Sequence, residues 1–244
     1  KLKWLALLAC WPWLSLGGDL PEPVLPAGVG VNIHFVTGHE QDLDLLHADG
    51  FPFLRMDFAW AAIERRKGQY HWSEYEQLLA NLERRGLRAI FILDYSHPLY
   101  EQAVRSPEPL SGVVHETTAS PQHPQSIAAY ARWAAASAAH FHGHRILWEL
   151  WNEPNGSFWA PKADAQQYTT LALAAAKAIR KADPQATIIG PASSGFPWPF
   201  LETFLQSGIL KYLDAVSVHP YRSPKRAPET AAADYQKLRQ LIDR

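Results

Sequence analysis

Apolar and polar residues alternate along most of this chain in two patterns. Short apolar runs typical of buried strands take turns with longer segments whose apolar residues recur every three or four positions, as on one face of a helix. The runs predict strands at residues 29–35, 53–58, 87–93, 146–151, 187–190 and 215–218. The helical pattern predicts helices at residues 40–49, 73–85, 127–141, 164–183, 200–206 and 230–244.

Several residues at the ends of these segments agree with the predicted helices. Ser73 and Glu76 match a capping box, and Asp164 is a suitable N-cap for the longest helix. Gly50 and Gly86 each lie just after a predicted helix and just before a predicted strand. A left-handed residue that ends the helix explains both glycines.

Strands that alternate with helices predict a parallel sheet. A doubly wound sheet is the alternative to a barrel, but the predicted strand–helix units exceed what a flavodoxin-like fold needs. No Gly-x-Gly-x-x-Gly follows the first strand either. We therefore predict an α/β fold, a (β/α)8 TIM barrel that is incomplete, with about six βα units over residues 28–244. The Pro-rich residues 19–27 are interpreted as a linker.

The N-terminal residues 1–18 have the features of a signal peptide that lacks its initiator Met. Two lysines precede an apolar run at residues 4–14, and small residues follow it. The run is too short to cross a membrane, so we expect no transmembrane segment and an exported, secreted or periplasmic protein. Lipoprotein processing at Cys10 is the less favoured alternative, because the residues before it match a cleavage box only loosely.

Composition narrows the choice of partner. The chain has 244 residues, 47% of them hydrophobic, which is enough for a substantial core. The net charge is −1, and the Lys and Arg residues are scattered, so nucleic acid is not an expected partner. The 10 Trp residues are core packing or flat platforms for a ligand.

Polar and aromatic residues collect where the predicted strands end. In (β/α)8 barrels the active site lies at the C-terminal ends of the strands. Charged and amide groups at the end of a buried strand need partners or a solvent-filled cleft. The residues at these ends are His34, Arg55, Asp57, Asp94 to His97, Asn152, Glu153, Ser193, Ser194 and His219 to Tyr221.

The sequence Trp151-Asn152-Glu153-Pro154 directly follows the fourth predicted strand. Pro154 predicts an extended backbone for Glu153, which would hold its carboxyl at the mouth of the barrel. A carboxyl there can act as a general acid, and Asn152 can bind a substrate hydroxyl. A capped loop carboxylate without catalytic role is the alternative. Glu149 lies deeper in the strand and is interpreted as structural, whereas Trp159 is a candidate sugar platform that could equally pack under a loop.

The Trp-Asn-Glu-Pro sequence at this place resembles the acid/base motif of the clan A glycoside hydrolases, which are (β/α)8 barrels that retain anomeric configuration. Arg55 matches an Arg at the end of strand two in this clan, and His219 and Tyr221 match a His and a Tyr after strand six. The segment 60–72 looks like the second βα loop of these enzymes, and within the clan the sequence looks most like family 39, the group of β-xylosidases and bacterial exopolysaccharide glycosidases.

The resemblance implies a retaining glycosidase with a carbohydrate substrate and no cofactor. Glu153 would be the catalytic acid/base, and Arg55 and Tyr221 would position the nucleophile. The candidate substrate-binding residues are Asn152, Arg55, His219, Tyr221, His34 and Trp159.

The clan's nucleophile is a second Glu at the end of strand seven, and this sequence ends after the sixth unit. Glu202 and Glu229 fall on a helix or a loop and do not match that position. A retaining mechanism needs two carboxyl groups about 5–5.5 Å apart. We therefore expect the natural protein to continue and the 244 residues alone to be catalytically incomplete.

Other chemistries have weaker support in the sequence. His140, His142 and His144 could bind a metal, but they precede strand four and would lie opposite the active site, so we predict no metal. A barrel that binds carbohydrate without cleaving it is the main alternative function. A sugar isomerase or aldolase would need metal ligands or a Schiff-base Lys at a strand end, and the sequence offers neither.

Overall fold

The computed structural model describes residues 19–22, 24–107 and 111–244. The predicted signal peptide and the alternative processing site at Cys10 lie outside the described residues. Within the described ranges, none of the helices combines the length and the hydrophobicity needed to cross a membrane.

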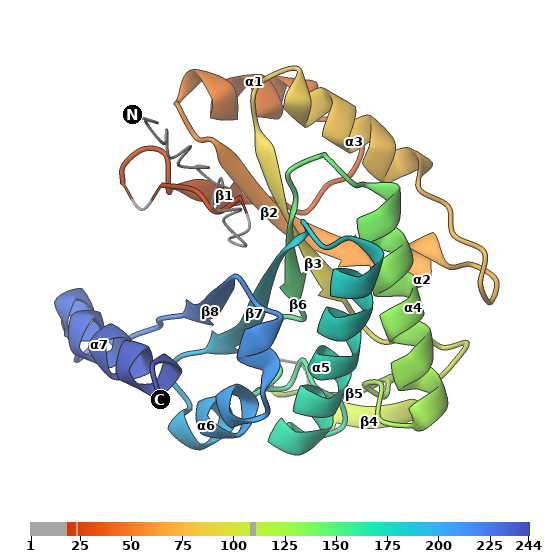
Figure 1. Ribbon diagram of the computed structural model, residues 1–244, viewed down its shortest axis with the longest axis vertical. Coiled ribbons are helices and arrows are strands. Elements are labelled where there is room, and N and C mark those ends of the chain that lie inside the picture. Colours follow the sequence, from red (N-terminus) through yellow and green to blue (C-terminus); the bar gives the residue numbers. More distant parts are fainter. Residues whose placement is uncertain (1–18, 23, 108–110) are drawn as a thin grey trace, which may run out of the picture.

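A six-stranded parallel sheet curls through the centre of the molecule (Figure 1). Its order is β1 (Gly30–Asn32), β2 (Phe53–Ala59), β3 (Arg88–Asp94), β6 (Leu147–Leu150), β7 (Thr187–Ser194) and β8 (Ala215–His219). Strand order follows chain order, and among the described residues β1 and β8 each pair with a single neighbour. This topology confirms the predicted incomplete (β/α)8 barrel, because a doubly wound sheet reverses its strand order.

The helices lie along the outer, convex side of the sheet (Figure 1). The six predicted helices are present, with bounds shifted by a few residues: α1 (Glu40–Ala48), α3 (Ser73–Glu83), α4 (Pro124–His140), α5 (Ala165–Ala182), α6 (Trp198–Gln206) and α7 (Ala231–Ile242). Shorter helical segments that the pattern did not predict are α2 (Trp60–Ile63), η1 (Ile209–Lys211) and η2 (Pro228–Thr230).

An antiparallel hairpin was also missed. It consists of β4 (Ala103–Pro107) and β5 (Val114–Thr118), and it lies in the connection between β3 and α4. Its strands are largely exposed, so they lack the apolar alternation by which a half-buried strand is recognised. The hairpin therefore lengthens the loop that follows β3, on the side of the barrel where active sites form.

Three of the four predicted helix-end features are present. Asp164 accepts hydrogen bonds from the backbone N–H groups of Gln166 and Gln167, and Gly50 and Gly86 have left-handed φ angles of 80° and 68°. The prediction of a capping box at Ser73 is wrong, because Trp72 occupies the N-cap of α3 and its side chain makes no capping hydrogen bond. The indole of Trp72 stacks on His140, with ring centroids 5.0 Å apart, and this packing fixes where the chain enters the helix.

The two faces of the sheet carry two separate apolar clusters. The outer cluster joins the sheet to the helices and includes Leu54, Met56 and Phe58 of β2. The inner cluster lies at the floor of the barrel and consists of Phe53, Leu147 and Ile189, with Ile90 and Ala215 packed against them. This division follows from the two-residue period of a strand, which sends Phe53, Arg55 and Asp57 to the inner face. Polar side chains therefore stand above a small apolar floor.

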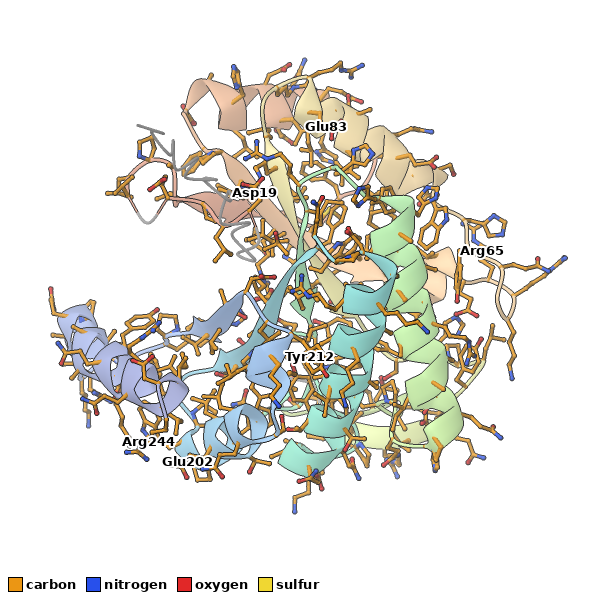
Figure 2. All side chains as sticks on the ribbon, viewed as in Figure 1. Asp19, Arg65, Glu83, Glu202, Tyr212 and Arg244 are labelled. Carbon is orange, nitrogen blue, oxygen red and sulfur yellow. The ribbon has the colours of Figure 1, made fainter. Side chains whose placement is uncertain are left out.

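Ion pairs close the N-terminal end of the barrel, opposite the strand ends that carry the motif. Asp19, labelled in Figure 2, pairs with Arg88 at the start of β3 and with Arg145 just before β6. The hydrogen bond from Arg145 is the main reason why the pKa of Asp19 lies below its ordinary value. These contacts attach the segment before β1 to the bottom of the sheet.

The three alternating histidines before β6 each contact a different carboxylate. His140 lies 2.7 Å from Glu76, His142 lies 3.0 Å from Asp183, and His144 lies 2.7 Å from Glu83. His140 and His144 contact two different positions of α3, and His142 contacts the residue that ends α5, so the three side chains do not share one carboxylate. Among the residues that the structure describes, no group of three or more His, Cys, Asp or Glu side chains could hold a metal ion.

Candidate active site

Glu153 lies in the loop after β6, and its carboxylate contacts the end of β8. Oε1 of Glu153 is 2.7 Å from Nδ1 of His219, and the two side chains are 15% and 21% exposed. Tyr221, which is 67% exposed, lies beside the same carboxylate, and desolvation together with the charge of Glu153 raises the pKa of its hydroxyl. The fold thus brings together three residues that are far apart in sequence.

The backbone of Glu153 differs from the predicted extended conformation. Its φ is 46°, in the left-handed region that non-glycine residues seldom adopt, and Trp151 has a φ of 72°. Pro154 disfavours the right-handed helical conformation of Glu153, but a tertiary contact decides among the others. The N–H of Glu153 donates to the carbonyl of Ala192 at 3.0 Å, which fixes this turn against β7. Such backbone strain is typical of functional sites.

A second contact holds the same loop to the end of β7. The Asn155 amide donates to the carbonyl of Ser194 at 3.0 Å and accepts from the N–H of Ser194 at 2.8 Å. Because both polar ends of the amide are bonded, the loop that carries Glu153 has a defined position relative to the sheet.

Arg55 is the centre of a hydrogen-bond network inside the barrel. Nε donates to Glu149 at 2.7 Å, Nη2 donates to Oδ1 of Asn152 at 2.9 Å, and Nη1 donates to Oδ1 of Asn32 at 3.3 Å. Since Oδ1 of Asn152 accepts from Arg55, its Nδ2 is oriented outward, where it donates to the Tyr95 hydroxyl at 3.1 Å. Arg55 therefore orients the amide that precedes Glu153.

Glu149 takes part in this arrangement as the charge partner of Arg55. Its side chain is 3% exposed and that of Arg55 is 22% exposed, so the ion pair is largely removed from water. Asn32, another partner of Arg55, was not among the predicted site residues. It is the last residue of β1 and lies two residues before His34. The two-residue period of a strand could have placed both side chains on the same face.

His34 lies at the rim of the site. Its Nε2 accepts a hydrogen bond from Nδ2 of Asn32 at 2.9 Å, and its Nδ1 is 3.9 Å from Asp57. The imidazole is mostly exposed and does not reach Glu153 in any contact that the structure shows.

The sequence left two roles open for Trp159, a sugar platform or packing under a loop, and the structure shows the second. Its side chain is fully buried, its Nε1 donates to Gln167 at 3.2 Å, and its ring packs against Trp151 and Tyr168. The loop after β6 folds back onto α5, and an indole at this position can lie only in the outer core. The half-exposed ring next to it in sequence, Phe158, stacks instead on Tyr95.

Asp94, at the end of β3, is a fully buried carboxyl that faces Asp57. Burial, and then the negative charge of Asp57, raise the pKa of Asp94 well above its ordinary value. Neither oxygen of Asp94 has a hydrogen-bond donor among the described residues, so the neutral form of the carboxyl is favoured.

We expect Asp94→Asn to change how stability depends on pH. The pKa of Asp94 is higher in the folded protein than in the unfolded chain, so the buried carboxyl stabilises the fold most at pH values below the unfolded-state pKa. This contribution to stability is lost as the pH rises through the folded-state pKa. Between these two pKa values, the free energy of unfolding of the unmodified protein should fall, relative to that of the variant, by up to about 1.4 kcal/mol for each unit of rising pH. Urea unfolding at several pH values from about 4 to 8 measures the difference. Asp49→Asn, on the exposed end of α1, is the control, and parallel profiles for Asp94→Asn would contradict the prediction.

The fold and sequence are similar to those of known glycosidases. The family model for cellulase (glycosyl hydrolase family 5) matches residues 24–236. A β-xylosidase of Geobacillus stearothermophilus is 35% identical over 95 residues, which cover 38% of this chain and 19% of that protein.

Two solved structures show the same fold. A monomeric β-xylosidase from Caulobacter crescentus superposes with a TM-score of 0.67 at 20% identity, over 88% of this chain and 49% of that one. A family 39 enzyme from Xanthomonas axonopodis pv. citri gives a TM-score of 0.64 at 20% identity, over 88% and 47% of the two chains. This chain thus spans about half the length of these structures.

These matches confirm the predicted clan of glycoside hydrolases, with a family 5 model along the sequence and family 39 enzymes among the structures of similar fold. The family model covers most of the chain, including both strand ends that meet at Glu153. The chain belongs to the cellulase family, glycosyl hydrolase family 5.

Proposed function

We propose that this chain supplies the acid/base half of a retaining glycosidase that acts on an oligosaccharide or polysaccharide. The observation that carries the proposal is the Glu153 carboxylate, which is held by His219 and has Tyr221 beside it at the C-terminal end of the barrel. Glu153 protonates the oxygen of the leaving group in the first step. In the second step it takes a proton from the water that attacks the sugar.

The surrounding groups have distinct tasks in this proposal. His219 fixes the position of the Glu153 carboxylate, so that its second oxygen can face the glycosidic bond. Asn152, oriented by Arg55, offers its Nδ2 to a hydroxyl of the sugar whose bond is broken. A hydrogen bond of this kind strengthens as positive charge develops in the transition state.

The second carboxyl, the nucleophile, is proposed to come from the part of the barrel between β8 and β1. Those two strands have one neighbour each within the described residues, and a barrel closes through strands that pair with both. A nucleophile on such a strand would project toward the same mouth as Glu153.

A β-xyloside is the first substrate to test, since the Geobacillus relative is a β-xylosidase. The decisive experiment follows product formation by ¹H NMR, using the protein with its complete barrel and xylotriose as substrate. The first-formed product should have the anomeric configuration of the substrate. Inversion would refute the retaining mechanism, and saturable binding without turnover would favour a carbohydrate-binding barrel.

A further inference from the structure

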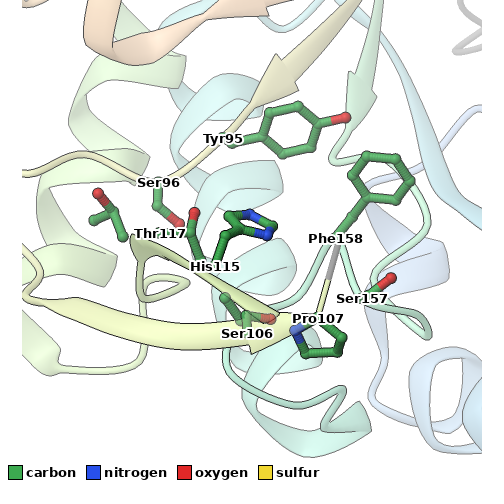
Figure 3. A pocket seen from close by; sticks show the side chains of 10 residues that line it. Tyr95, Ser96, Ser106, Pro107, His115, Thr117, Ser157 and Phe158 are labelled. Carbon is green, nitrogen blue, oxygen red and sulfur yellow. The ribbon is translucent and has the colours of Figure 1, made fainter. Parts of the chain in front are cut away.

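A pocket outside the Glu153 site lies between the β4–β5 hairpin, the end of β3 and the loop after β6 (Figure 3). Its volume is about 290 Å³, close to the lower end of the range of about 300–1,000 Å³ that is typical of small-molecule sites. In Figure 3, Tyr95 lies on one side of this space, and Ser106 and Pro107 of the hairpin lie on the opposite side.

Ser106 of β4 provides evidence that the pocket is built for a ligand. The residue is 1% exposed, it lines the pocket, and its Oγ has no hydrogen-bond partner within the described part of the chain. A buried hydroxyl without a partner lowers the stability of the fold, and nearly all such groups in proteins are satisfied. A ligand hydroxyl in the pocket would supply the missing partner.

The lining of the pocket specifies the chemistry of its ligand. Hydroxyl groups come from both sides, and the rings of Tyr95 and Phe158 add apolar surface. Of the described residues that line the pocket, none is Asp, Glu, Lys or Arg, and His115 is the single one of them that can carry a positive charge, so a cationic ligand would have no counterion there and an anionic ligand at most one. Hydroxyls beside aromatic rings suit an uncharged sugar, which presents both hydroxyl groups and C–H faces.

The pocket shares a wall with the Glu153 site. Tyr95 contributes its ring to the pocket, while its hydroxyl accepts the hydrogen bond from Asn152. Tyr95 and Phe158 stack with ring centroids 5.7 Å apart and planes 10° apart. Ser120, just after the hairpin, exchanges two 2.9 Å hydrogen bonds with Ala160. The hairpin therefore holds a fixed place beside the loop that carries Phe158.

We propose that this pocket is a subsite for a second, uncharged sugar residue of the substrate, next to the sugar that Asn152 contacts. This inference rests on the proposed glycosidase function and extends it. A substrate of two or more sugar residues then gains contacts with the hairpin that a single sugar on an aryl leaving group does not make.

The test compares Ser106→Ala with the unmodified protein, with its complete barrel, on two substrates. We expect kcat/KM for xylotriose to fall about fivefold, the effect of one lost neutral hydrogen bond. The value for 4-nitrophenyl β-D-xyloside should stay within about twofold, and the thermal midpoint should not fall, because Oγ of Ser106 has no partner within the described part of the protein.

Ser137→Ala is the matched control. Ser137 is also a buried serine, but its Oγ donates to the carbonyl of Trp133 at 2.8 Å and lies on α4, away from the pocket. It should leave the ratio of the two kcat/KM values unchanged. An unchanged rate on xylotriose for Ser106→Ala, or an equal loss on both substrates, would overturn the subsite alone. Failure of the unmodified protein to hydrolyse either substrate would overturn the proposed function, and the subsite with it.

Discussion

Replacement of Glu153 by Gln should lower kcat for xylotriose by about 10²–10⁴-fold, the usual contribution of a general acid or base. Gln has the shape of Glu and can still accept a hydrogen bond from His219, but it can neither donate nor take the transferred proton. A good leaving group, such as 4-nitrophenolate, departs with little protonation. The first step on the aryl glycoside should therefore be much less affected, as a pre-steady-state burst would show.

Glu202→Gln is the matched control for this substitution. Glu202, labelled in Figure 2, lies on the exposed side of α6, so the same carboxyl-to-amide change is made there outside the site. Glu202→Gln should leave kcat for both substrates unchanged. A Glu153→Gln protein with unchanged turnover of xylotriose would show that Glu153 is not the acid/base.

Replacement of Arg55 by Met should lower the free energy of unfolding by about 3–5 kcal/mol, as expected when one partner of a buried ion pair is removed. Glu149, which is 3% exposed, would be left as a buried charge without its counterion. The additional substitution Glu149→Leu should recover most of this loss, because the fold then buries neither charge. Urea unfolding of the two single variants and the double variant measures the coupling.

Arg239→Met provides the comparison for an exposed pair. Arg239 and Asp243 form an i,i+4 contact on α7 with both side chains largely exposed, and such pairs contribute about 0.3–0.5 kcal/mol. Equal stability losses for Arg55→Met and Arg239→Met would refute the importance of the Arg55–Glu149 pair. So would a double variant that is no more stable than Arg55→Met.

The sequence predicted the fold well because its main determinant is periodic. The residues of β2 alternate between the outer core and the barrel interior, and the helices repeat their apolar residues along one face. These repeats arise because each strand or helix buries one of its faces, so the pattern can be recognised within the residues of that segment alone. The β4–β5 hairpin has no such repeat, because its strands are mostly exposed and owe their position to pairing with each other.

The site was predicted in composition but only partly in geometry. His219 and Tyr221 do lie at Glu153, because consecutive parallel strands end at the same side of a barrel. The φ of Glu153 could not be predicted, and the sequence could not decide between the two roles of Trp159, because each depends on a partner that is distant in sequence. The hydrogen bond to Ala192 fixes the backbone of Glu153, and packing against α5 fixes the position of Trp159.

The separation of the two apolar clusters has a consequence for how such enzymes diverge. The outer cluster, between sheet and helices, contains most of the large buried side chains, while the inner cluster consists of Phe53, Leu147 and Ile189 with two flanking residues. Changes among the polar residues above that small inner floor leave the outer cluster intact. Side chains on the inner face and in the hairpin can therefore change without any change in the outer cluster that joins the sheet to its helices.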